Sequence, residues 1–97
     1  MSFTVVIPIY RNSENIDELM QALDRLAEGM AGDMDAIFVV DGSPDDSYQK
    51  LSKALDGRRF SSQLLSLSRN YGSFSAIRAG LAHAHGQAMG VMAADLQ

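Results

Sequence analysis

Residues 36–47 read AIFVVDGSPDDS, a run that passes from an apolar strand through a turn into the start of a helix. The segment AIFVV (36–40) is continuously apolar, which is typical of a strand buried on both faces. Asp-Gly at 41–42 ends this strand because it is a strong turn signal. SPDD (43–46) then predicts a helix N-terminus, with Ser43 as N-cap, Pro at the first helical position and the last Asp completing a variant of the capping box. The stretch predicts a strand–turn–helix unit.

The same alternation of strand and helix signals continues on both sides of this unit. Before it, FTVVIPI (3–9) is another continuously apolar strand, and apolar residues from Ile16 to Met30 recur at the spacing of an amphipathic helix. Asn12 or Ser13 is expected to cap that helix. After it, we expect a strand within 60–67, a helix opened by Gly72 and Ser73 and ended by Gly86, and an apolar strand over 88–94. The predicted order is β-α-β-α-β-α-β, a mostly parallel α/β sheet.

The second and third helices are each expected to turn apolar residues toward the sheet. Gly57 is expected to end the second helix. The residues expected on the inner faces are Tyr48, Leu51 and Leu55 in the second helix, and Phe74, Ile77, Leu81 and Ala84 in the third.

The expected topology predicts where a ligand would bind. Right-handed crossovers favour an open sheet with strand order 3-2-1-4, with the first two helices on one face and the third on the other. Ligands of such sheets bind beyond the carboxyl ends of the strands, where the order reverses. Residues 8–12, 41–43 and 95–97 lie at those ends. We therefore expect the carboxylates of Asp41 and Asp95 to face one crevice.

Composition limits the classes of function. The 97 residues suffice for one domain, and a net charge of −4 with no basic cluster larger than Arg58-Arg59 disfavours a nucleic-acid partner. The chain has no cysteine, which excludes disulfides and thiolate metal sites. It also lacks a bilayer-length apolar run and a signal peptide, so we expect a cytoplasmic location. A sheet face covered by a single helix leads us to expect the N-terminal portion of a longer protein.

Several common motifs are absent, and three residues remain as candidates. The sequence has neither a GxGxxG fingerprint after the first strand nor a Walker A sequence, and it shows no Ser/His/Asp set. Asp41 could bind a ribose hydroxyl or a base N–H, or belong to a plain turn and helix cap, although the cap leaves it unexplained. Asp95 could hold Mg²⁺ or Mn²⁺ together with substrate phosphates, or be a solvated strand end. Arg69 could help to bind an anion, or be solvated in its loop.

Four stretches together resemble a known family. They are VVIPIYRNSENI (5–16), VVDGSPDDS (39–47), SRNYGSFSAIRAGLAHAHG (68–86) and MAADLQ (92–97). In this order and spacing they resemble the start of a family 2 glycosyltransferase with the GT-A fold, and within it the polyprenyl-phosphate sugar transferases related to dolichyl-phosphate mannose synthase. The resemblance implies that residues 1–97 are the Rossmann-like, nucleotide-sugar-binding portion of a GT-A domain. It also implies transfer of a sugar from a nucleotide donor to a lipid phosphate or other acceptor.

The resemblance further implies roles for single residues around the nucleotide base. Pro8 and Tyr10 would belong to the loop that walls the base, and Asn12 follows in the same loop. Asp41, with Gly42 after it, would correspond to the acidic residue that contacts the base.

By the same resemblance, three further residues would lie near the phosphates. Arg69 would be near the nucleotide and its phosphates. Asp95 matches the last acid of the family's D-x-D motif, which binds Mg²⁺ or Mn²⁺ on the donor diphosphate, and Gln97 lies beside it. The metal would act as a Lewis acid that stabilises the departing diphosphate.

The sequence departs from the family pattern at four positions. Asn12 stands where the family usually has Glu, Val40 and Ala93 replace the first acids of two motifs, and Ser73 replaces a frequent Lys. A metal site that has lost a carboxylate is expected to bind its ion more weakly, with the phosphates compensating in part.

The resemblance also implies that the acceptor half would lie beyond residue 97, together with the general base and any membrane helices. Residues 1–97 alone are therefore expected to be inactive, with membrane association only through the longer parent at the cytoplasmic face. The alternative is a noncatalytic nucleotide-sugar-binding or scaffold module of the same fold. A nucleotidyltransferase is disfavoured because no Gly-rich basic loop follows the first strand. The open sheet also predicts self-association through the fourth strand or the bare face.

Overall fold

The computed structural model describes residues 3–30, 34–58, 60–84 and 88–91. The strands are β1 (Phe3–Ile9), β2 (Met34–Asp41), β3 (Ser61–Leu67) and β4 (Ala88–Val91). The helices are α1 (Ile16–Gly29), α2 (Ser47–Ala54) and α3 (Ser73–Ala82), and a short 3₁₀ helix, η1 (Ser13–Asn15), leads into α1. The predicted alternation of strands and helices is therefore confirmed.

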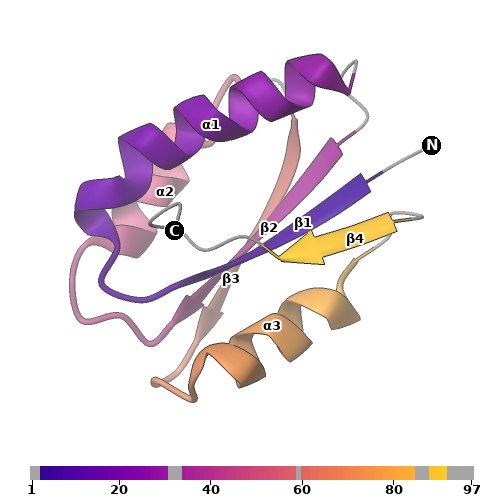
Figure 1. Ribbon diagram of the computed structural model, residues 1–97. Helices are drawn as coiled ribbons and strands as arrows, with labels where there is room; N and C mark the ends of the chain where they lie inside the picture. Colours follow the sequence, from indigo (N-terminus) through magenta and orange to yellow (C-terminus); the bar gives the residue numbers. More distant parts are fainter. Residues whose placement is uncertain (1–2, 31–33, 59, 85–87, 92–97) are drawn as a thin grey trace.

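The strands form one parallel sheet in the order β3-β2-β1-β4 (Figure 1). The register pairs Ile9 with Val40 and Asp41 with Leu67. The carboxyl ends of β1, β2 and β3 consequently lie along one edge, which is where the sequence placed the candidate site. The predicted strand order 3-2-1-4 is confirmed, as is the α/β fold class.

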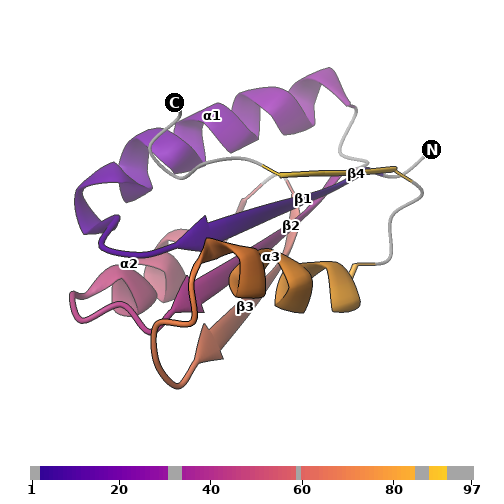
Figure 2. The ribbon, with the colours of Figure 1, turned by 60° about the horizontal axis from the view of Figure 1, so that its bottom comes forward.

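Helices cover the two faces of the sheet unequally. Helices α1 and α2 lie on one face and α3 lies on the other, as predicted (Figures 1 and 2). Because side chains alternate along a strand, β2 contributes Phe38 and Val40 to the core under α1 and α2, and Ile37 and Val39 to the core under α3. Asp41 continues the second series, so its side chain belongs to the α3 side.

The predicted inner face of α3 is wrong in its large residues. Phe74 is 82% exposed and Leu81 is 39% exposed, whereas Ile77 is half-buried. Ala84, just beyond the helix, does pack against the core under α3, as predicted. The helix is therefore rotated so that its bulky apolar residues point away from the sheet.

Small residues allow α3 to lie close to the sheet. The inward positions are Ala76, Ala79 and Gly80. A Cβ atom added to Gly80 would lie 2.4 Å from Cγ1 of Val6, which leaves no room for any side chain there. Close contact between the α3 backbone and β1 thus decided the orientation of the helix, because a face carrying Phe74 would have held it away from the strands.

The predicted start of α2 is also wrong. The helix begins at Ser47, four residues after the expected N-cap Ser43, and the chain bends between them. The N-cap is Asp46, which makes no capping hydrogen bond from its side chain. Asp45, one residue earlier, binds the start of the helix instead: its Oδ1 accepts hydrogen bonds from the Ser47 backbone N–H at 3.1 Å and from the Ser47 hydroxyl at 2.6 Å. Tyr48, expected to face inward, is 41% exposed, while Leu51 is fully buried as predicted.

The first helix lacks the expected side-chain cap as well. Asn12 precedes η1 without capping it, and no side-chain hydrogen bond caps α1. Helix α1 is therefore stabilised mainly by hydrophobic packing and not by capping of its ends. The packed residues form a fully buried stripe that includes Leu19, Met20 and Leu23. Among the described residues, no helix is both long and apolar enough to cross a membrane.

Candidate functional site

The loops after β1 and β2 are bound to each other at the carboxyl edge of the sheet. The backbone N–H of Arg11 donates a hydrogen bond of 2.8 Å to the hydroxyl of Ser43, and the N–H of Ser13 donates one of 3.3 Å to Oδ2 of Asp45. Ser13 also donates a short hydrogen bond from its hydroxyl to Asp46. The segments that the sequence assigned to one crevice, 8–12 and 41–43, therefore meet as predicted.

Asp41 links this pair of loops to the loop after β3. Its side chain is almost completely buried, and Oδ1 accepts a hydrogen bond of 2.9 Å from the backbone N–H of Tyr71. Among the described residues, no hydrogen bond to Oδ2 of Asp41 is present, which leaves this oxygen able to accept one from a ligand. The contact with Tyr71 joins the turn after β2 to the loop after β3, a role that the turn-and-cap interpretation of the sequence did not include.

Gly42 allows the loop after β3 to cross directly over the end of β2. Its φ is +64°, which is in the left-handed region that favours glycine. A Cβ atom at this position would lie 2.1 Å from the carbonyl carbon of Arg69 and 2.3 Å from the backbone nitrogen of Asn70. Only glycine leaves space for that crossing. Gly42 therefore allows the backbone of Arg69 to lie directly against the turn that carries Asp41.

Two exposed pairs of an arginine and a tyrosine border the same edge. The guanidinium carbon of Arg11 lies 5.3 Å from the ring centre of Tyr10, and that of Arg69 lies 4.9 Å from the ring centre of Tyr71. Tyr10 and Arg69 were predicted from the sequence as site residues. Tyr71 was missed, although it follows Arg69 and Asn70 immediately and its backbone N–H is the group that fixes Asp41.

Asn12 shapes the loop that carries Tyr10. Its Oδ1 accepts a hydrogen bond of 2.8 Å from the Tyr10 N–H, and its Nδ2 donates one of 3.2 Å to Oδ1 of Asn15. Pro8 is half-buried near the end of β1, two residues before Tyr10. These contacts place Pro8, Tyr10 and Asn12 on one short segment beside the Asp41 turn.

Asp45 is a carboxylate whose oxygens are used within the protein. Oδ1 accepts from Ser43 and Ser47, and Oδ2 accepts from Ser13. Burial alone would raise the pKa of Asp45, but these hydrogen bonds together outweigh it and lower the pKa from 3.8 to about 2. Asp45 therefore stays ionised at neutral pH and ties the loops to α2.

The residues expected to bind metal fall outside the structure's description. Asp95 and Gln97 both lie in 92–97, beyond the described residues. In the described part of the chain, no group of three or more His, Cys, Asp or Glu residues could hold a metal ion. Asp45 uses both of its oxygens within the protein and Asp41 has only one left, so the metal prediction continues to rest on Asp95.

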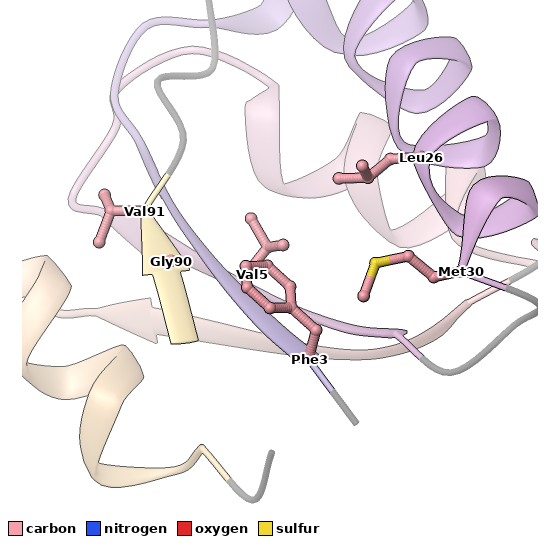
Figure 3. Close-up of a pocket in the computed structure, with 6 residues that line it drawn as sticks. All are labelled: Phe3, Val5, Leu26, Met30, Gly90 and Val91. Carbon is pink, nitrogen blue, oxygen red and sulfur yellow. The ribbon is translucent and has the colours of Figure 1, made fainter. Parts of the chain in front are cut away.

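Two hollows of similar size differ in chemistry. A polar cleft of about 360 Å³ lies at the carboxyl edge on the α2 side, lined by Val40, Gly42, Ser43, Asp45, Tyr48, Gln49, Ser66, Leu67 and Ser68. An apolar hollow of about 350 Å³ lies elsewhere. There Leu26 of α1 and Met30, just after that helix, point toward Phe3 and Val5 of β1, with Gly90 and Val91 of β4 alongside (Figure 3). Its described lining residues include no polar side chain for a nucleotide and none of the predicted site residues.

Sequence comparison identifies relatives of this chain. The model of the family described as Glycosyl transferase family 2 matches residues 4–97. A protein from Klebsiella pneumoniae subsp. pneumoniae is 34% identical and one from Enterobacter sp. (strain 638) is 36% identical, each over 94 residues. Both are named undecaprenyl-phosphate 4-deoxy-4-formamido-L-arabinose transferase. The matches cover 97% of this chain, which spans only 29% of the length of each relative.

Solved structures share the fold. S. aureus TarS (residues 1–349), in complex with UDP, superposes with a TM-score of 0.85 at 23% identity, covering 98% of this chain and 28% of that one. The mannosyltransferase PcManGT from Pyrobaculum calidifontis, in complex with GDP-Man and Mn²⁺, superposes with a TM-score of 0.81 at 22% identity, covering 96% of this chain and 27% of that one. These superpositions confirm the predicted GT-A arrangement of strands and helices.

Proposed function

Since this chain belongs to glycosyl transferase family 2, we propose that it is the donor-binding portion of a glycosyltransferase that moves a sugar from a nucleotide-sugar to a polyprenyl phosphate. This choice of acceptor is supported by the curated relatives, which are named as transferases of a sugar to undecaprenyl phosphate. Because the relatives are much longer, we assign the acceptor pocket and the general base to sequence outside residues 1–97. These residues alone are then expected to bind donor without transferring sugar.

The state of Asp41 is the observation that carries the proposal. One oxygen is held by the Tyr71 N–H at 2.9 Å, and the other makes no hydrogen bond to the described residues. A carboxylate fixed in this way can accept a hydrogen bond from the N–H of a nucleotide base without first having to be ordered, which lowers the cost of binding. We assign Asp41 to the base, in agreement with the resemblance seen in the sequence.

The remaining contacts of the donor follow from the same edge. Tyr10, 39% exposed, offers an aromatic surface against which the base can stack, with Pro8 and Asn12 shaping its loop. Arg69, held against Gly42, offers a guanidinium for the donor phosphates. These assignments use side chains from the loops after β1, β2 and β3, which the hydrogen bonds already tie into one unit.

For the metal, we assign Asp95 as the protein ligand of Mg²⁺ or Mn²⁺, with Gln97 next to it. A single carboxylate suits these ions only when water and donor phosphates supply the other oxygens, so metal and nucleotide are expected to bind together. When bound, the ion would stabilise the negative charge that develops on the leaving diphosphate. The described residues have a separate task, which is to hold the base and phosphates in place.

A nucleotide panel tests the proposal. The thermal unfolding midpoint would be measured with UDP, GDP, dTDP and CDP, each with and without Mn²⁺. We expect a shift for one nucleotide, and a larger one with Mn²⁺. Asp41→Asn keeps an oxygen for the Tyr71 N–H but removes the charge, so it should fold normally and bind that nucleotide about 10-fold to 100-fold more weakly.

The controls separate the site from general effects. Asp56→Asn, an exposed change outside the site, should leave nucleotide binding unaltered. Wild-type affinity in Asp41→Asn would contradict the assignment of Asp41. Sugar transfer catalysed by residues 1–97 alone would contradict the assignment of the general base elsewhere, and a longer parent that binds donor but never transfers sugar would indicate a noncatalytic module.

A further inference from the structure

Arg11 has a backbone conformation that is unusual for its residue type. Its φ is +54°, and in the described part of the chain it is the one residue other than glycine with a positive φ. The left-handed region costs free energy for any residue with a Cβ atom, because this atom then lies close to the following carbonyl oxygen. Arg11 follows Tyr10 directly, so its conformation sets the direction of the chain beside the ring proposed to stack on the base. Contacts with other residues are needed to hold Arg11 in this state.

The hydroxyl of Ser43 supplies such a contact from the loop after β2. The backbone N–H of Arg11 donates a hydrogen bond of 2.8 Å to Oγ of Ser43, which lies 32 residues later in the chain. The Ser43 hydroxyl in turn donates its proton to Oδ1 of Asp45 at 2.5 Å. Because a hydroxyl has a single proton, this donation leaves the lone pairs of Oγ to accept from the Arg11 N–H. Asp45 therefore orients Ser43, and Ser43 holds Arg11.

The conformation of Arg11 is coupled to the ring of Tyr10. The guanidinium carbon of Arg11 lies 5.3 Å from the centre of that ring, and the Tyr10 N–H donates a hydrogen bond of 2.8 Å to Oδ1 of Asn12. These contacts are internal to residues 10–12, so they shape the turn. The hydrogen bond to Ser43 attaches the turn to the loop that also carries Asp41.

We propose that Ser43 is a positioning residue for donor binding, whose hydroxyl keeps the Tyr10 ring in place by holding Arg11 in its left-handed conformation. This proposal rests on the proposed function, in which Tyr10 stacks on the base and Asp41 accepts a hydrogen bond from it. A loop that is ordered before the nucleotide arrives loses less conformational entropy on binding. The sequence predicts Ser43 as the cap of the second helix, and the structure gives its hydroxyl this different task.

Tryptophan fluorescence tests the hold on the loop without any nucleotide. Because the chain has no tryptophan, Tyr10→Trp introduces a single reporter in the loop. In this background, Ser43→Ala should lower the fluorescence anisotropy of the tryptophan and increase its quenching by acrylamide, since the turn loses its bond to the loop after β2. Ser43→Thr keeps a hydroxyl and should restore both signals. Ser47→Ala is the matched control, because the Ser47 hydroxyl also donates to Oδ1 of Asp45 but belongs to α2.

Nucleotide affinity tests the consequence for the donor. For whichever of UDP, GDP, dTDP and CDP binds, Ser43→Ala should raise the dissociation constant about fivefold, and Ser43→Thr should restore it. Ser47→Ala should leave the dissociation constant unchanged. In a Tyr10→Ala background, Ser43→Ala should have little further effect, because no ring is left to position. Each measurement is made well below the unfolding midpoint of the variant, so that a loss of stability alone does not change the affinity.

Two results would overturn the proposal. The first is a tryptophan signal that Ser43→Ala leaves unchanged, or that Ser47→Ala changes equally. The second is an equal loss of nucleotide affinity from Ser43→Ala with and without the Tyr10 ring, which would mean that Ser43 acts on another part of the site. A wild-type chain that binds none of the nucleotides would contradict the proposed function and with it the donor role of Ser43. A changed tryptophan signal would in that case still show that Ser43 orders the loop.

Discussion

Two carboxylates four residues apart show how local contacts assign different tasks to the same chemical group. Asp41 and Asp45 both follow β2, yet Asp45 accepts hydrogen bonds at both oxygens while Asp41 accepts only one within the described chain. Asp45 is therefore a structural group and Asp41 retains capacity for a ligand. The distinction depends on the Tyr71 backbone, which comes from 30 residues farther along the chain.

At Gly42, conformation and space both require glycine, and two substitutions separate these requirements. Gly42→Ala should lower the free energy of unfolding by at least about 2 kcal/mol, because the φ of +64° is strained for alanine and the Cβ atom meets the Arg69 backbone. Gly57→Ala, with φ +75° and open space around it, should cost about 1 kcal/mol. Urea unfolding of both variants measures the difference, and equal losses would show that the contact with Arg69 contributes nothing.

The hydrogen bonds of Asp45 predict a particular pH dependence. Its folded pKa is lowered from 3.8 to about 2, so its contribution to stability is complete above pH 4 and is lost as the pH falls toward 2. We expect about 1–2 kcal/mol at neutral pH, less than a fully buried group would give. Asp45→Asn should lower the free energy of unfolding at pH 7 and flatten its decline between pH 4 and pH 2. Asp56→Asn, at an exposed position, serves as the control. A decline as steep in Asp45→Asn as in the wild type would refute this origin.

Among the elements, α3 differs from α1 in how it meets the sheet. Helix α1 buries a stripe of large apolar residues, whereas α3 presents Ala76, Ala79 and Gly80 and keeps Phe74 outside. Small residues allow the backbone of a helix to lie close to the strands. The packing of α3 on the sheet therefore requires that these side chains stay small. This close approach leaves the ring of Phe74 on the outside of the helix.

The two helical glycines should respond to alanine with opposite signs. Gly80→Ala gains helix propensity, but its Cβ atom would lie 2.4 Å from Val6 Cγ1, so we expect a net loss of about 1–3 kcal/mol in the free energy of unfolding. Gly29→Ala, near the end of α1 with no atom within 4 Å of its Cβ, should gain up to about 1 kcal/mol. Chemical denaturation measures both changes. A stabilising Gly80→Ala would mean that α3 lies farther from β1 than the structure indicates.

For the whole molecule, the open edge of the sheet at β4 is the main unsatisfied feature. Among the described strands β4 pairs only with β1, and Val91 at its end is 53% exposed beside the apolar hollow of Figure 3. An edge strand offers unpaired backbone groups to another chain, and the adjoining apolar surface adds to the attraction.

We therefore expect the protein to self-associate through this edge. Its net charge of −4 opposes association, so the mass measured by light scattering should rise with protein concentration and rise further with added salt. Val91→Lys should reduce association, while Tyr48→Lys, on α2, should change it little. A monomeric mass at every concentration and salt level would contradict this expectation.

The periodic pattern of apolar residues was sufficient to predict the fold. Continuous apolar runs specified buried parallel strands, the helical stripe of α1 specified its inner face, and crossover handedness then led to the order 3-2-1-4. These features can be predicted because each element buries its apolar residues at a regular spacing, which repeats along the sequence. Asp41, Tyr10 and Arg69 could also be predicted as site residues, because turn signals and family motifs can each be recognised from a few neighbouring residues.

Only the tertiary structure decided how individual side chains are used. Helix α2 starts at Ser47, not at the predicted position, and the N–H of Ser47 is bound by Asp45. Phe74 of α3 faces outward, not inward as predicted, because Gly80 fits closely against Val6. Tyr71 became part of the site because its backbone reaches Asp41 across the end of β2. The periodicity of apolar residues can be seen in the sequence of a single segment. The contacts named above join segments that are distant in the sequence, and they form only when the strands have paired.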